Sequence, residues 1–121
     1  MQELNILVVD DEEHTRLGYT EILKMGGHHV DMAADGMEGL ALAENKSYDI
    51  IITDLHMPRL NGVQFVEKLS ERNDSAKKII ITAFGSYKSY KDTAARGACL
   101  YLNKPVRAAD LEAAINECQK S

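Results

Sequence analysis

Short runs of apolar residues alternate along the chain with longer segments in which apolar residues recur at helical spacing. The runs near 6–9, 50–54 and 78–82 are almost continuously apolar, which is typical of strands buried on both faces of a parallel sheet. Shorter runs at 29–34 and 100–103 predict two more strands. The helical spacing predicts five helices, which end near residues 25, 45, 72, 96 and 119.

This alternation of strand and helix predicts an α/β fold, doubly wound, with a five-stranded parallel sheet and helices on both faces. The length of 121 residues suits one domain, and neither a repeat nor an interdomain linker is visible. In open parallel sheets, functional groups gather at the C-terminal ends of the strands. The residues at those ends are therefore the first candidates for a site.

Composition narrows the classes of function. The net charge of −5 argues against direct nucleic-acid binding, which needs a basic surface. No apolar run approaches the ~20 residues that a membrane span requires. The N-terminus also lacks the basic and apolar regions of a signal peptide. We therefore expect a cytoplasmic domain without a membrane partner.

The two cysteines, Cys99 and Cys118, are too far apart in sequence for a Cys-x-x-Cys motif. Nothing else in the sequence points to an oxidising compartment, where disulfides persist. We expect both to be free thiols packed as small hydrophobic side chains.

Polar residues end the predicted strands. Asp10 and Asp11 follow the first strand, Asp54 ends the third, Thr82 ends the fourth, and Lys104 follows the fifth. Three adjacent carboxylates repel one another, and a hard divalent cation such as Mg²⁺ removes that cost. Phosphoryl oxygens suit the remaining positions, beside an ammonium and a hydroxyl. The pattern predicts phosphoryl transfer to a carboxylate nucleophile.

Each of these residues has a structural alternative. Asp11 or Glu12 is expected to cap the first helix whether or not a metal binds nearby. The threonine at 82 also suits a strand by propensity alone, and the lysine at 104 also suits an ordinary surface position.

Four segments together resemble the receiver domain of two-component response regulators, and the resemblance covers essentially the whole chain. The segments are Val8-Val9-Asp10-Asp11-Glu12, the stretch from Asp54 to Gly62 (DLHMPRLNG), Ile81-Thr82-Ala83, and Tyr101-Leu102-Asn103-Lys104-Pro105. The resemblance implies a flavodoxin-like sheet with strand order 2-1-3-4-5 and five helices, formed by one receiver domain over residues 1–121.

The resemblance implies that Asp54 accepts the phosphoryl group and that the cofactor is Mg²⁺. The metal ligands would be Asp11, Asp54 and the backbone carbonyl of His56, with Asp10 acting largely through a metal-bound water. Lys104 would pair with the phosphoryl group.

Three further roles follow from the same resemblance. The bond from Lys104 to Pro105 would be cis. Thr82 would bond a phosphoryl oxygen, and Tyr101 would be the aromatic residue that turns inward when Thr82 moves. Ordinary packing is the alternative for this tyrosine.

Two positions near the acceptor are expected to tune hydrolysis of the phosphorylated state. In the family, the residues two positions after the acceptor and after the site threonine influence how water reaches the phosphorus. Here they are His56 and Phe84. Because Phe84 is bulky and apolar, we expect slow hydrolysis; for His56 a plain surface role is the alternative.

Helical phase predicts two surfaces. On the first helix, His14, Leu17 and Glu21 face outward and are candidates for docking a phosphodonor. On the fourth helix, Tyr87 and Tyr90 are candidates for an output face, with ordinary packing as the alternative. A glycine within the first helix, Gly18, is unfavourable there, and we expect close packing against the sheet to explain it.

The expected function is that of a signalling domain that catalyses its own phosphorylation and dephosphorylation. The expected donor is a sensor histidine kinase or a histidine phosphotransfer protein. The changed surface would then act on an output domain, another partner or a second copy. One alternative is a phosphatase of the haloacid dehalogenase type, but that family has an acid where His56 stands. A flavodoxin-like FMN carrier conflicts with the acids at 10–13, which would repel a phosphate, and a receiver fold used only for binding is the remaining alternative.

Overall fold

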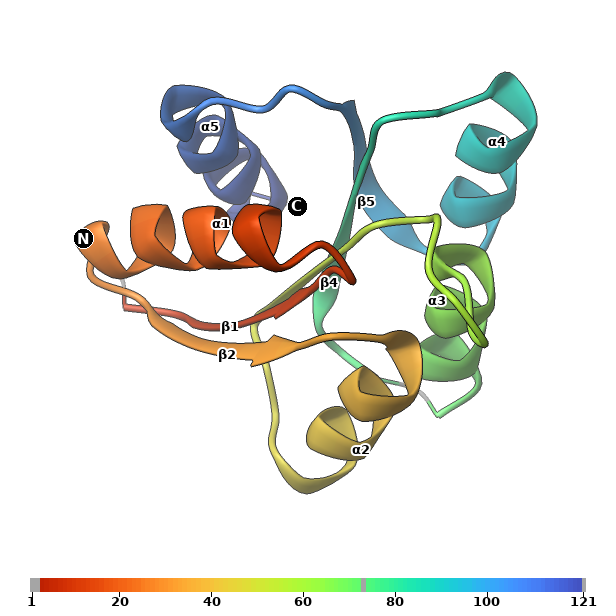
Figure 1. The fold of residues 1–121 in the computed structure, drawn as a ribbon. Helices are drawn as coiled ribbons and strands as arrows, with labels where there is room; N and C mark the ends of the chain where they lie inside the picture. Colours follow the sequence, from red (N-terminus) through yellow and green to blue (C-terminus); the bar gives the residue numbers. More distant parts are fainter. Residues whose placement is uncertain (1–2, 73, 121) are drawn as a thin grey trace.

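Five strands and five helices alternate strictly along the chain in the computed structural model, which describes residues 3–72 and 74–120 (Figure 1). The elements are β1 (Asn5–Val9), α1 (Glu13–Met25), β2 (His29–Ala33), α2 (Gly36–Asn45), β3 (Ile50–Thr53), α3 (Gly62–Glu71), β4 (Lys77–Thr82), α4 (Tyr87–Ala95), β5 (Ala98–Asn103) and α5 (Ala108–Gln119). All strand pairs are parallel, and the order across the sheet is β2-β1-β3-β4-β5. The predicted fold class and strand order are confirmed.

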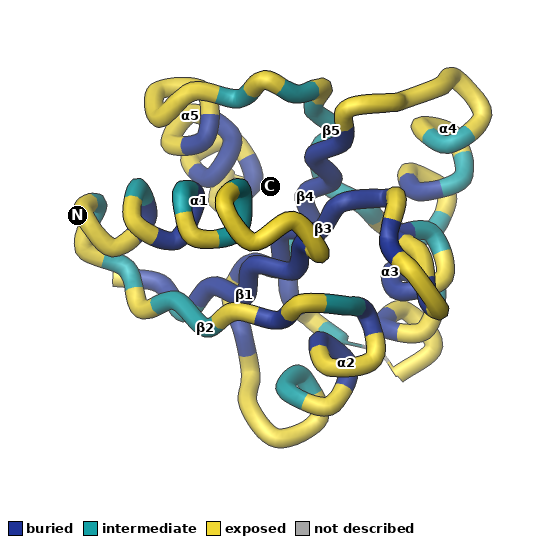
Figure 2. The backbone as a smooth tube through the Cα atoms, viewed as in Figure 1, coloured by how far each residue is buried: buried dark blue, intermediate teal, exposed yellow. Residues whose placement is uncertain are grey.

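Helices cover both faces of the sheet (Figure 1). One core lies between the sheet and the pair α1 and α5, which we call the α1/α5 face. The opposite face packs against α2, α3 and α4. The central strands β1, β3 and β4 are almost entirely buried, whereas β2 and β5 at the edges are only partly buried (Figure 2). The near-continuous apolar runs therefore correspond to the inner strands.

Side-chain caps fix where the helices begin. Glu12 caps α1 by accepting hydrogen bonds from the backbone N–H groups of His14 and Thr15. Asp35 caps α2, and reciprocal capping boxes begin α3 at Asn61 and α4 at Ser86. Such bonds satisfy N–H groups that have no partner within the helix. With Glu12 in this role, Asp11 does not serve as the cap.

Three expectations about the fold are corrected. The first concerns Gly18. A methyl group built there would meet no atom within 4 Å outside its own helix backbone and chain neighbours, so close packing does not explain this glycine. The second is the start of β5, which begins at Ala98 rather than Leu100 because Ala98 already pairs with Lys78, with a β-bulge between Ala98 and Leu100.

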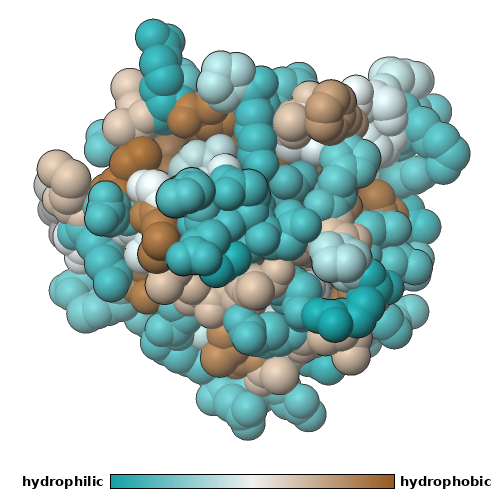
Figure 3. All heavy atoms as spheres, in the orientation of Figure 1, coloured by the Kyte–Doolittle hydropathy of each residue, from teal (hydrophilic) through white to brown (hydrophobic). Residues whose placement is uncertain are grey.

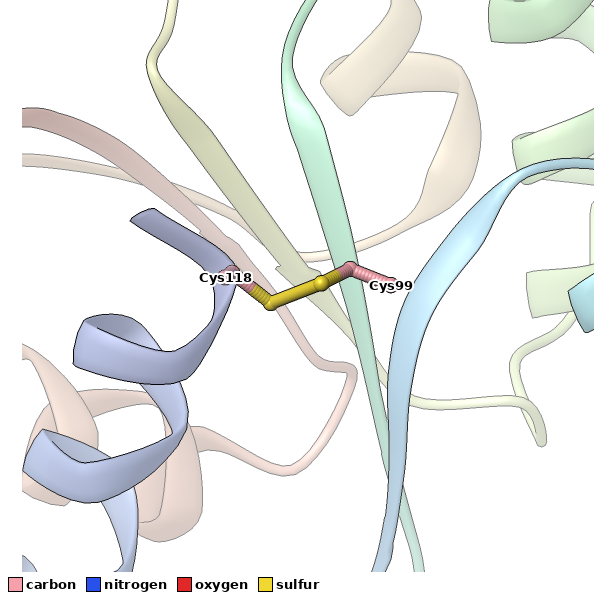
Figure 4. The surroundings of a disulfide bond; sticks show 2 residues. All are labelled: Cys99 and Cys118. Atoms are coloured by element: carbon pink, nitrogen blue, oxygen red, sulfur yellow. A yellow bond between two sulfur atoms is a disulfide. The ribbon is translucent and has the colours of Figure 1, made fainter. Parts of the chain in front are cut away.

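The cysteines are the third correction, because Cys99 and Cys118 form a disulfide between β5 and α5 (Figure 4). The Cα atoms are 6.1 Å apart, within the range that a disulfide spans. The sequence reasoning failed because separation along the chain says nothing about distance once α5 packs back against β5.

Among the described residues, no helix is both long and apolar enough to cross a membrane.

Candidate functional site

The Asp54 side chain lies immediately after β3, at the C-terminal edge of the sheet, and the residue is only 7% exposed. Its Oδ1 accepts hydrogen bonds from the backbone N–H of Leu55, at 2.6 Å, and of His56, at 3.2 Å. These bonds hold one carboxylate oxygen and aim the other, Oδ2, toward Lys104. The carboxylate is thus fixed in orientation before any ligand arrives.

Asp10, Asp11 and Asp54 come together because β1 and β3 are neighbours that end at the same level, with Val9 paired to Thr53. Each aspartate offers an oxygen, and the three oxygens lie within 4.8 Å of one another. Asp10 is buried and Asp11 is exposed, so the cluster opens toward solvent on one side. The chain thus brings the three predicted acids into one cluster.

Lys104 offsets part of this negative charge. Its Nζ lies 2.9 Å from Oδ2 of Asp54 and 3.2 Å from Oδ2 of Asp10. Burial alone would lower the pKa of the lysine, but the hydrogen bond to Asp54 and the two carboxylate charges outweigh burial and raise it. Burial raises the pKa of Asp10, against the opposing effects of the Glu12 N–H and of the ammonium. The peptide bond from Lys104 to Pro105 is cis, as the resemblance implies.

Thr82 ends β4 beside this cluster and is fully buried. Its Oγ1 has no hydrogen-bond partner, and among the described residues no other buried side-chain oxygen or nitrogen lacks one. A buried hydroxyl without a partner costs about 1–3 kcal/mol, so such groups usually mark a role that the resting structure leaves unused. A phosphoryl oxygen in the site would supply the missing acceptor.

The residues present fit a hard divalent cation. The cluster offers carboxylate oxygens, which Mg²⁺ prefers, and its exposed side leaves room for the waters that this ion retains. Asp10, Asp11 and Asp54 would hold the ion. The backbone carbonyl of His56 belongs to the loop that follows Asp54, where the resemblance expects a further ligand.

Two contacts shape the surroundings of the site. The ring Nε2 of His56 lies 2.9 Å from the backbone oxygen of Phe84, and the two rings meet edge to face at 6.1 Å between centroids. This contact joins the loop after β3 to the loop after β4. The side chain of Phe84 is 79% exposed. The two positions expected to tune hydrolysis are therefore neighbours.

Tyr101 lies on β5 and its hydroxyl reaches the first turn of α4. Its oxygen is 2.6 Å from Oγ of Ser89 and accepts a hydrogen bond from the backbone N–H of Ser86 at 3.2 Å. A methyl group at Gly85 would come within 2.6 Å of the same hydroxyl. Tyr101 therefore contacts the loop that carries Thr82 into α4.

Sequence reasoning missed two residues around the site. Ser89 is one; the Ser-x-x-Ser spacing with Ser86 is the signal of a cap, but nothing in it points to Tyr101. Arg16 is the other, since its Nη1 donates a 2.7 Å hydrogen bond to the backbone oxygen of Asp10. An arginine one turn into a helix carries no sequence signal for a contact to the preceding loop.

The two predicted surfaces are exposed. On α1, His14, Leu17 and Glu21 all face solvent, with Leu17 40% exposed. On α4, Tyr87 and Tyr90 are exposed and their ring centroids are 6.4 Å apart. Exposed hydrophobic residues occur as separate patches around a largely hydrophilic centre in the view of Figure 3.

Fold and site together define a response regulator receiver domain, and the comparison with known families agrees. The family model described as response regulator receiver domain matches residues 6–116, so the chain belongs to this family. Receiver domains take phosphoryl groups from histidine kinases and generally bind Mg²⁺ through acidic residues. The predicted family is confirmed.

Curated relatives are similar over most of this chain. The transcriptional regulatory protein CusR of Escherichia coli (strain K12) is 34% identical over 112 residues, which is 93% of this chain and 49% of CusR. The response regulator MprA of Mycobacterium sp. (strain KMS) is 34% identical over 102 residues, which is 84% of this chain and 44% of MprA. The chain thus spans less than half the length of these relatives.

Solved structures match the fold closely. The chemotaxis protein CheY4 of Vibrio cholerae aligns with a TM-score of 0.91 and 28% identity, covering 97% of this chain and 99% of CheY4. A response regulator receiver domain protein from Clostridium thermocellum aligns with a TM-score of 0.89 and 33% identity, covering 96% and 94% of the two chains.

Proposed function

We propose that residues 1–121 form one receiver domain in which Asp54 accepts a phosphoryl group in a reaction that depends on Mg²⁺. The donor is a phosphohistidine on a sensor histidine kinase or on a histidine phosphotransfer protein. The observation that carries the proposal is the surroundings of Asp54. Its fixed carboxylate belongs to the acidic cluster with Asp10 and Asp11 and lies 2.9 Å from the Lys104 ammonium. The neighbouring strand β4 ends in Thr82, whose buried hydroxyl has no hydrogen-bond partner among the described residues.

The reaction is a single displacement at phosphorus. A carboxylate oxygen of Asp54 attacks in line, the new P–O bond forms as the P–N bond of the donor breaks, and the electron pair of that bond returns to the imidazole. When bound, Mg²⁺ supplies positive charge to the attacking carboxylate and to the phosphoryl oxygens. The protein contributes position and charge, which are the main requirements of phosphoryl transfer.

The product adds negative charge where the resting site has an ammonium and an unused hydroxyl. The Lys104 ammonium moves from the carboxylate to pair with a phosphoryl oxygen, and the Thr82 hydroxyl donates a hydrogen bond to another phosphoryl oxygen. Movement of Thr82 shifts the loop that leads into α4, and Tyr101 responds because its hydroxyl is bonded to that helix start. Phosphorylation then biases the exposed α4 and β5 surface between two arrangements.

The partners follow from the position of the surfaces. We propose that the donor docks over the exposed side chains of His14, Leu17 and Glu21 on α1, the helix that begins just after Asp10 and Asp11. The surface of Tyr87 and Tyr90 serves an output domain, another partner or a second copy. The phosphatase alternative finds no support in the site, because the position two residues after the acceptor is an exposed histidine rather than an acid.

Intact mass tests the proposal. The protein is incubated with acetyl phosphate and Mg²⁺, beside Asp54→Asn, which keeps the shape of the side chain and removes the nucleophile. We expect one phosphoryl adduct that requires Mg²⁺ and is absent from the variant. If no adduct accumulates, beryllofluoride replaces the phosphoryl donor and tyrosine fluorescence is followed. No change in either experiment would leave a receiver fold that acts only by binding.

A further inference from the structure

The disulfide joins α5 to β5, and β5 is part of the surface that phosphorylation is expected to change. Cys99 lies near the start of β5, two residues before Tyr101, and Cys118 lies in the last turn of α5 (Figure 4). Cys118 is fully buried in the core of the α1/α5 face, whereas Cys99 is partly exposed. The bond therefore ties the end of the last helix to an edge strand.

A β-bulge aims Cys99 at its partner. In the pairing of β4 with β5, Lys78 is opposite Ala98 and the next residue, Ile79, is opposite Leu100. Cys99 is thus the extra residue that the bulge inserts between Ala98 and Leu100. As a result, Cys99 and Leu100 both pack on the α1/α5 face, although successive strand residues normally alternate between faces.

The bulge also separates Cys99 from Tyr101. Residues two apart on a regular strand share a face, but here Tyr101 packs on the opposite side of the sheet, against the cluster of Leu55, Val66 and Ile80. The register that points Cys99 toward α5 is therefore the same register that points Tyr101 toward α4. A bond that holds Cys99 in this register therefore also holds the orientation of Tyr101.

We propose that Cys99 and Cys118 form a reversible dithiol–disulfide pair, whose oxidation clamps the end of α5 onto the bulged start of β5 and whose reduction releases it. This goes beyond phosphorylation and does not depend on the chemistry of Asp54. Besides the two cysteines, the core of this face is built mostly from buried aliphatic side chains, so we expect the fold to persist without the bond. A thiol is also a small apolar group that this core accommodates.

The exchange needs an oxidant, which is a low-molecular-weight disulfide such as oxidised glutathione. The thiolate of Cys99, the more exposed of the two, attacks one sulfur of that disulfide and releases one glutathione as a thiol. The thiolate of Cys118 then attacks the Cys99 sulfur and releases the second. The protein loses two electrons and two protons, and one disulfide is reduced to two thiols.

Equilibration in glutathione buffers of varied reduced-to-oxidised ratio tests reversibility. Thiol exchange in the 121-residue chain is quenched with acid, and the intact mass is measured by mass spectrometry. The disulfide form is lighter by about 2 Da, the two hydrogens lost on oxidation. We expect the two forms to interconvert from either starting state and to reach the same ratio. A pair that stays oxidised in reduced glutathione, or stays reduced in oxidised glutathione, would overturn the proposal.

Hydrogen exchange of the unphosphorylated protein tests the clamp. We expect the amides of 98–103 and 111–120 to exchange about fivefold more slowly in the disulfide form, because a clamped segment opens less often. The amides of β1 serve as the internal reference. Cys118→Ala should exchange like the reduced protein in both buffers. Equal exchange rates in the two redox states would contradict the proposed clamp. Because no phosphoryl donor is present, that result would leave the proposal for Asp54 untouched.

Discussion

The hydroxyl of Tyr101 lies 2.6 Å from the hydroxyl of Ser89, within the first turn of α4. Ser89 is at the same time the return half of the capping box that begins this helix at Ser86. The side chain of β5 that is expected to move on phosphorylation is therefore bonded to the cap of the neighbouring helix. Movement of Tyr101 breaks this bond and changes the start of α4 directly.

A double-mutant cycle measures that bond. Ser89→Ala and Tyr101→Phe each remove one hydroxyl, and the double variant removes both. We expect a coupling of about 0.5–1.5 kcal/mol in the free energy of unfolding in urea, the usual net value of one hydrogen bond. If the effects of the two substitutions on the free energy of unfolding are additive, the contact contributes nothing to stability.

Thr82→Val should stabilise the unphosphorylated protein. The substitution removes a buried hydroxyl that has no partner, and we expect the free energy of unfolding to rise by about 1 kcal/mol. Thr53→Val is the matched control, because the hydroxyl of Thr53 is also buried but donates a 2.9 Å hydrogen bond to the backbone oxygen of Asp54. The control should lose stability in the same urea titration; equal losses in both variants would contradict the prediction.

Lys104→Ala should tighten Mg²⁺ binding. The ammonium competes with the ion for the charge of Asp10 and Asp54. Its removal should lower the Kd by about fivefold, close to the ~1 kcal/mol between unit charges 4 Å apart in water. Isothermal titration with MgCl₂ measures this, with the exposed Lys68→Ala as control. Weaker binding in Lys104→Ala would mean that the lysine positions the carboxylates rather than competing for them.

Phe84→Ala should shorten the lifetime of the phosphorylated protein severalfold. Its ring contacts His56 edge to face, and the family resemblance implies that these two positions influence how water reaches the phosphorus. Loss of phosphorylated mass after removal of the donor gives the half-life. Tyr87→Ala, which removes a similarly exposed aromatic group from α4, is the control. Equal half-lives for Phe84→Ala and wild type would refute the shielding role.

Gly18→Ala should raise the free energy of unfolding by about 1 kcal/mol, because alanine favours a helix interior over glycine and the added methyl group meets open space. Gly62→Ala should have the opposite effect. There a Cβ would lie 2.3 Å from the backbone oxygen of Asp54, so the loop that carries the acceptor would have to move. Thermal unfolding of both variants compares them, and a destabilised Gly18→Ala would point to a role for the flexibility of α1.

The fold and the acidic cluster were predictable because each depends on a local pattern. Continuous apolar runs mark the inner strands, and a polar residue directly after such a run must lie at the edge of the sheet. Asp10, Asp54 and Lys104 were placed together by that rule alone. The family resemblance added the order of the strands.

The remaining features depend on contacts between distant segments, which local patterns do not encode. The disulfide requires the bulge at Cys99, and the bulge follows from the pairing of β4 with β5. The bond from Tyr101 to Ser89 likewise requires α4 to be docked on β5. For Gly18, propensity identified an unfavourable residue, but only the packing shows that its surroundings are empty.

The ion pair between Asp10 and Lys104 joins residues 94 positions apart, which directly follow the first strand and the last. A nascent or truncated chain without docked β5 already carries Asp54 but lacks the cation that accompanies it. The charge that surrounds Asp54 is therefore complete only when β5 has docked on β4 and the whole sheet has assembled.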